Sequence, residues 1–84
     1  GGEAAPVAAR ASFEAEERRV LVQAAAVRIL KAAGQMTQAA LVDALAEALS
    51  GRFRVDATLA RRALDYLLDK EYIARSGELY TYVA

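Results

Sequence analysis

Apolar residues return every three or four positions between Phe13 and Ala33, which is the spacing of one broad helix face. This pattern predicts a long helix over that range, with Ser12 as its N-cap and Gly34 as the residue that ends it. The face expected to enter the core consists of Leu21, Val22, Ala25, Ala26, Ile29, Leu30 and Ala33.

Two shorter amphipathic helices are predicted after a short extended link at Gln35-Met36. The first spans about residues 38–50 behind the N-cap Thr37, with Leu41, Leu45, Ala48 and Leu49 on its apolar side. The second spans about residues 57–70 behind the N-cap Asp56. Its buried stripe is expected to be Ala60, Ala63, Leu64, Leu67 and Leu68, and its solvent side Arg61, Arg62, Asp65 and Asp69. In the loop between them, Phe53 and Val55 are expected to reach the core.

The end of the sequence changes from helical to alternating spacing. Residues 72–75 and 78–83 are rich in aromatic and β-branched side chains, and the turn dipeptide Ser76-Gly77 separates them. A β-hairpin is therefore predicted. Three helices followed by a hairpin give an α+β fold of the winged-helix type. We expect this domain at residues 13–84, preceded at residues 1–12 by a flexible linker or a segment derived from the expression vector.

The composition narrows the chemistry that the chain can perform. A domain of 84 residues has a thin core and little room for an enclosed active site. The sequence has no cysteine and no histidine, so it lacks thiolate ligands and the commonest general base. Its carboxylates are spaced as on ordinary solvated helices. We therefore expect a protein that is not an enzyme, with no catalytic residue, no metal site and no cofactor.

A second row of apolar residues lies on the solvent side of the long helix. Val20, Ala24 and Val27 precede Lys31 by 11, 7 and 4 positions, so the four residues are in line, with Arg28 beside them. This row is either a docking surface for a partner or an ordinary alanine- and valine-containing helix surface. The lysine itself is unusual in this chain, because nine of the 11 basic residues are arginine and only Lys31 and Lys70 are lysine.

Three stretches, read in order, resemble the end of a cullin. Residues 17–31 have an acidic-basic start followed by the run Gln23-Ala24-Ala25-Ala26-Val27-Arg28-Ile29-Leu30-Lys31, which is similar to the family's Gln-Ala-Ala-Ile-Val-Arg-Ile-Met-Lys pattern. Residues 69–75 resemble the segment before the wing, and Tyr80-Thr81-Tyr82-Val83-Ala84 resembles the family's ending. With Arg52-Phe53 between them, the resemblance covers about residues 16–84.

The resemblance implies a function for Lys31. In cullins the lysine that closes the first motif forms an isopeptide bond with the ubiquitin-like modifier of the neddylation pathway, and this modification activates a RING ubiquitin ligase. The implied partners are the modifier, its conjugating enzyme and the RING subunit, with Val20, Ala24, Val27 and Arg28 as candidate docking residues. One departure is that Ala32, Ala33 and Gly34 replace the basic residues that usually follow the acceptor.

Only a neutral amine can attack a thioester carbonyl, and a lysine side chain is almost entirely protonated at neutral pH. Lys31 is expected in the last turn of its helix, where the dipole favours a cation. The sequence around it offers no general base. We therefore expect the conjugating enzyme and the RING partner to supply deprotonation and positioning.

Two alternatives remain open from the sequence. In a DNA-binding winged helix, Arg61 and Arg62 would face the groove, assisted by Arg52, Arg54 and Arg75. The zero net charge and the acids Asp65 and Asp69 on the same helix argue against nucleic acid as a partner. The other alternative is an unmodified architectural domain that only binds proteins.

Location follows from what the sequence lacks. No apolar run reaches the length of a membrane span, and no secretory signal opens the chain. We expect an intracellular protein, in the cytoplasm, the nucleus or both, without membrane partners.

Overall fold

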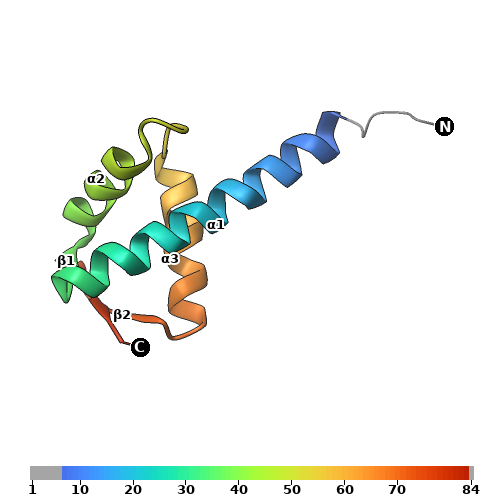
Figure 1. Cartoon of the computed structure of the whole chain (residues 1–84). Helices are drawn as coiled ribbons and strands as arrows, with labels where there is room; N and C mark the ends of the chain where they lie inside the picture. Colours follow the sequence, from blue (N-terminus) through green and yellow to red (C-terminus); the bar gives the residue numbers. More distant parts are fainter. Residues whose placement is uncertain (1–6, 84) are drawn as a thin grey trace.

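In the computed structural model of the chain, residues 7–83 are described, with side chains from Phe13 onward. The first helix, α1, runs from Val7 to Ala33. It therefore begins six residues before the predicted start, and Ser12 lies within the helix instead of capping it. Alanine-rich residues extend an existing helix at little cost, because alanine has the highest helix propensity and propagation is easier than nucleation. The N-terminal end of α1 projects beyond the other elements (Figure 1).

The predicted linker falls in two parts. Residues 1–6 lie outside the described residues, while residues 7–12 belong to α1. The composition of residues 7–12 lacks apolar periodicity, but its alanines favour a helix.

Helices α2 (Gln38–Leu49) and α3 (Ala57–Asp69) begin where the sequence predicts. The Thr37 hydroxyl accepts a hydrogen bond from Ala40 N at 3.2 Å, and the Asp56 carboxylate accepts one from Leu59 N at 2.8 Å. Both contacts satisfy backbone donors that a helix N-terminus leaves free. Each helix ends one residue earlier than predicted, with Ser50 and Lys70 as the C-caps.

The wing is part of a three-stranded antiparallel sheet in the order β1-β3-β2. Its strands are β1 (Gln35–Thr37), β2 (Ile73–Ser76) and β3 (Leu79–Tyr82). The predicted link at Gln35-Met36 is thus a strand, paired with β3 in the register Gln35↔Thr81. Ser76 pairs with Leu79, so the two-residue turn is Gly77-Glu78 and not Ser76-Gly77. Gly77 has φ +62°, which its position in the turn requires.

The core forms where the three helices and β3 meet. Side chains that are at least nine-tenths buried come from all of these elements, from the α2–α3 loop and from β2: Val22, Ala25, Ala26, Leu30, Leu41, Leu45, Leu49, Val55, Ala60, Ala63, Leu64, Leu67, Ile73 and Tyr80. Phe53 and Leu68 are half-buried against them. Two predicted core residues, Ala33 and Ala48, are exposed. Ala33 is the last residue of α1, where the chain turns away from the core.

Glu71 holds an unusual backbone conformation between α3 and β2. Its φ is +62°, the only positive value among the described residues other than glycine. Glu71 N donates to Leu68 O at 3.1 Å, and Tyr72 N donates to Leu67 O at 3.0 Å. These two bonds form a Schellman motif, in which the residue in the place of Glu71 is usually glycine. The strain of this left-handed residue is the cost of turning directly from α3 into the wing.

Replacing Glu71 with glycine should stabilise the domain by up to about 1 kcal/mol. Glycine adopts positive φ without the Cβ clash, and this gain exceeds the entropy that it adds to the unfolded chain. Urea unfolding followed by circular dichroism measures the change. Glu78→Gly is the matched control, because Glu78 has no positive φ, and it should be neutral or destabilising. An E71G variant no more stable than the starting protein would contradict this account of the turn.

Candidate modification site at the end of the first helix

Lys31 lies in the last turn of α1 with its side chain exposed to solvent. The preceding residue, Leu30, is fully buried in the core. Gly34, three residues after Lys31, has φ +83°, and its N–H donates to Leu30 O at 2.7 Å. This is the left-handed helix ending expected from glycine at that position. The helix end is therefore fixed from its inner side while Lys31 faces outward.

The wing also contacts this helix end. Tyr82 N donates to Gly34 O at 2.9 Å, directly after the last helical residue. From there β1 continues along β3, and Tyr80 of β3 is only 2 % exposed in the core. Segments almost fifty residues apart in the sequence thus meet beside Lys31.

The predicted docking row is only partly on the surface. Val20 is 53 % exposed, and Ala24 and Arg28 are exposed as predicted. Val27 is half-buried and packs against the core, so it also has a structural role. The exposed apolar part of the row that leads to Lys31 is therefore limited to Val20 and Ala24, fewer residues than the helical spacing indicated.

The ion pairs among the described side chains do not involve Lys31. They join Arg18 to Glu14, Arg19 to Glu16, and Arg61 to Asp65. Lys31 thus has no carboxylate within 4.0 Å among residues 13–83. The same residues contain no group of three or more acids that could hold a metal ion. The described residues therefore form neither an ion pair with Lys31 nor a metal site.

Lys70, the other lysine, has a different environment. It is the C-cap of α3, and its Nζ lies 5.7 Å from the centroid of the Tyr66 ring. The Arg19 guanidinium lies 5.1 Å from the centroid of the same ring. Cation–π contacts restrain a side chain that would otherwise be free in solvent. The two lysines therefore differ in how freely they are presented.

An exposed apolar pair lies in the wing, close to the strand that bonds to the end of α1. Tyr72 is 47 % exposed and Val83 is 56 % exposed. Val83 N donates to Tyr72 O at 3.2 Å, and the neighbouring Tyr82 is the residue bonded to Gly34. The alternating pattern of the tail placed these residues in a hairpin, but the pairing of β3 with β1 is what brings them near the end of α1.

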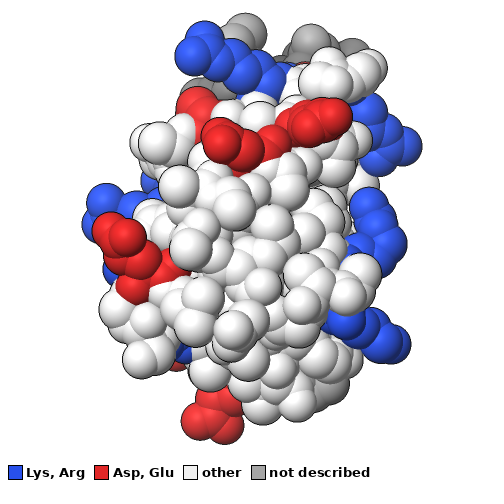
Figure 2. Space-filling model, turned by 90° about the vertical axis from the view of Figure 1, so that its left-hand side faces the viewer, with Lys and Arg blue, Asp and Glu red and all other residues white. Residues whose placement is uncertain are grey.

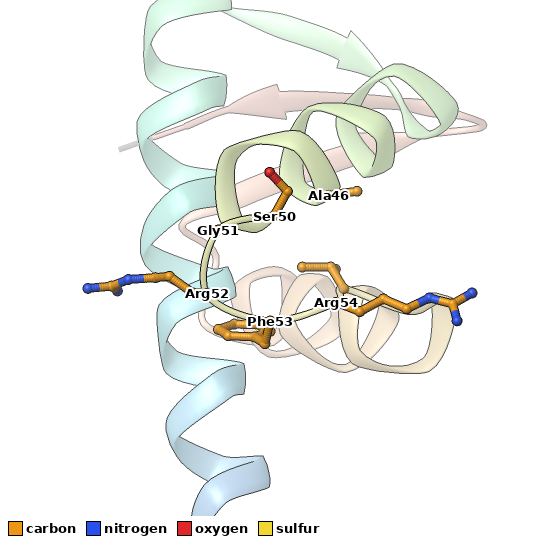
Figure 3. A pocket seen from close by; sticks show the side chains of 7 residues that line it. Ala46, Ser50, Gly51, Arg52, Phe53 and Arg54 are labelled. Atoms are coloured by element: carbon orange, nitrogen blue, oxygen red, sulfur yellow. The ribbon is translucent and has the colours of Figure 1, made fainter.

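The arginines of the DNA-binding alternative are divided between two places, with Arg61 and Arg75 beside Asp65 at one pocket and Arg52 and Arg54 at another. Arg61 lies 4.0 Å from Asp65, and Arg75 is occupied by a hydrogen bond to Gly77 O and by stacking over the Tyr80 ring. Arg52 and Arg54 point to opposite sides of a shallow cavity of about 370 Å³ at the α2–α3 loop (Figure 3). The face over α2 and the end of α1 is largely uncharged, with acidic and basic side chains at its margins (Figure 2).

No helix among the described residues is both long enough and apolar enough to cross a membrane.

Comparison with known proteins agrees with this geometry. Residues 17–78 match the family described as the cullin protein neddylation domain. Cullin-1 of Dictyostelium discoideum is 33 % identical over 72 residues, and Cullin-1 of Schizosaccharomyces pombe is 34 % identical over 70 residues. Each alignment covers 82 % of this chain and 9 % of the relative, so the chain spans about a tenth of the length of these cullins.

A solved structure shows the same fold over the whole domain. A chain of Dcn1(P)-Cdc53(WHB), described as a dual E3 mechanism for Rub1 ligation to Cdc53, superposes with a TM-score of 0.86 at 30 % identity, covering 99 % of this chain and 100 % of that one. The predicted winged-helix fold is thereby confirmed. With a family match over most of its length and these relatives, the chain belongs to the cullin family, as its neddylation domain.

Proposed function

We propose that this domain is the C-terminal module of a cullin-type scaffold of a RING ubiquitin ligase, and that Lys31 is the acceptor of a ubiquitin-like modifier that activates the ligase. The main support is the coincidence of two features. Lys31 closes the motif at residues 23–31, within the part of the chain that matches the neddylation domain. It is also exposed on a helix end that the core and the wing hold in place.

The reaction requires little chemistry from the domain. The neutral Lys31 Nζ attacks the thioester carbonyl that joins the modifier to the cysteine of the conjugating enzyme. The C–N bond forms and the C–S bond breaks, a base takes a proton from the attacking amine, and the cysteine thiolate leaves and takes up that proton to become the thiol. Since the described residues place no carboxylate within 4.0 Å of Lys31, we expect the conjugating enzyme and the RING subunit to supply the base and the alignment. The domain contributes presentation.

The partners follow from the same proposal. They are the modifier, its conjugating enzyme and the RING subunit, and the related structure concerns Rub1 ligation to Cdc53. Val20, Ala24, Val27 and Arg28 are the proposed docking residues, with Val20 and Ala24 contributing the exposed apolar part. These partners place the protein inside the cell, in the cytoplasm, the nucleus or both. The comparisons favour neither DNA binding nor an unmodified architectural role.

Mass spectrometry after reconstituted transfer tests the proposal. The chain is incubated with modifier, conjugating enzyme and RING subunit, digested, and searched for the branched peptide. We expect the branch at Lys31. A branch at Lys70, or no conjugate at all, would overturn the assignment. Omitting the RING subunit should slow transfer strongly, by about tenfold or more, because the domain itself provides neither a base nor alignment.

A further inference from the structure

We propose that Gly34 is a positioning residue for the acceptor lysine. This inference rests on the proposed function, because it concerns how Lys31 is presented for transfer. Gly34 joins the acceptor helix to the wing through both of its backbone polar groups. Its N–H donates to Leu30 O at 2.7 Å, and its carbonyl accepts from Tyr82 N at 2.9 Å.

One of these two hydrogen bonds joins Gly34 to the helix before it, and the other joins Gly34 to the wing. The bond to Leu30 closes the last turn of α1, the turn that contains Lys31. The bond from Tyr82 fixes the same residue to β3, whose Tyr80 is buried in the core. The last carbonyls of a helix have no partner within the helix, and the last turn frays unless such contacts hold it. Gly34 therefore connects the acceptor turn to β3 and, through β3, to the core of the domain.

Positioning matters here because the domain supplies no other assistance. Effective transfer needs the amine near the thioester carbonyl while the docking surface is engaged, and loss of alignment lowers the rate of the chemical step. A frayed last turn lets the Lys31 backbone sample many positions. The long lysine side chain absorbs part of this displacement, so the expected loss of rate is moderate. Docking through Val20 and Ala24, two or more turns earlier, is expected to be unaffected.

The glycine is required for its backbone conformation and not for space. Gly34 has φ +83°, and a Cβ built on it would meet no atom within 4 Å. A β-branched residue resists positive φ strongly, whereas asparagine tolerates it. Substitutions at Gly34 therefore change the helix ending through the backbone, since a Cβ at this position meets no neighbouring atom.

The wing turn offers a matched control. Gly77 has φ +62°, and a Cβ built there would also meet no atom within 4 Å. Gly34→Val and Gly77→Val thus impose the same kind of backbone strain, one beside Lys31 and one at the tip of the wing. Gly34→Asn keeps the left-handed conformation and serves as the conservative rescue. Gly34→Ala imposes a smaller strain and provides a variant that folds if valine does not.

Steady-state transfer of the modifier to these variants, with thermal melting alongside, tests the proposal. We expect G34V to lower kcat by roughly three- to tenfold with KM for the charged conjugating enzyme within about twofold, and G34A to lie between it and the starting protein. G34N should transfer normally. G77V should melt as early as G34V yet keep its kcat. Unchanged kcat in both G34V and G34A, or an equal loss in G77V, would overturn the role of Gly34. Absence of a Lys31 conjugate in the unsubstituted chain would instead overturn the proposed function.

Discussion

Replacing Lys31 with arginine should abolish conjugation of the modifier while the fold stays intact. Arginine keeps the positive charge in the last turn of α1, but its guanidinium remains protonated and does not attack a thioester. The side chain at this position is exposed and has no ion-pair partner among the described carboxylates. The free energy of unfolding of the domain should therefore change by less than about 0.5 kcal/mol. Time courses of transfer, resolved by gel mobility, should show at least a roughly 100-fold lower rate.

Lys70→Arg provides the control for this experiment. It also replaces a lysine at a helix end with arginine, and the cation–π contact with Tyr66 survives because arginine forms it as well. Transfer to the Lys70 variant should proceed as for the unsubstituted chain. If the Lys31 variant is conjugated at the normal rate, the acceptor lies elsewhere. If only the Lys70 variant fails, the acceptor is Lys70.

Replacing Leu45 with alanine should remove a large part of the stability of the domain. Leu45 is fully buried in the middle of α2, within the core that α1 and α3 complete. Truncating a buried leucine to alanine costs about 2–5 kcal/mol, because apolar contacts are lost and a cavity remains. A chain of 84 residues has a total stability of about 4–13 kcal/mol. The melting temperature should fall by about 10 °C or more.

Val20→Ala is the matched surface control for the core substitution. Val20 is 53 % exposed, so truncation there should cost less than about 0.5 kcal/mol. Circular dichroism melting of both variants checks the comparison. A Leu45 variant that melts close to the unsubstituted protein would show that α2 is not part of the cooperative core. The Val20 variant has a second use, because slower transfer at unchanged stability would support its role in docking.

Much of the fold is predictable from the sequence because its signals are local. The side chains of Thr37 and Asp56 bond to the helix that begins beside them, so the starts of α2 and α3 were predicted to the residue. Gly34 was predicted to end α1 for the same kind of reason. The start of α1 was wrong since alanine-rich residues are compatible with a helix without any apolar pattern.

The errors in the wing have a non-local cause. Strand β1 has three residues, and nothing in Gln35–Thr37 itself predicts that β3 will pair with it across more than forty residues. The turn at Gly77-Glu78 depends on the same register. The left-handed conformation of Glu71 was missed because the motif that imposes it consists of backbone bonds that Glu71 and Tyr72 donate to the carbonyls of Leu68 and Leu67.

The sequence alone determined the class of fold, the winged-helix order of elements and the cullin resemblance that singles out Lys31, since periodicity, capping and motif spacing are written along the chain. Only the tertiary structure decided how that lysine is held. The exposure of Lys31, the partial burial of Val27 and the bond from Tyr82 to Gly34 all depend on where distant segments pack against α1. A helical pattern shows which residues share a face, but the packing of the wing and the core determines which part of that face remains available to a partner.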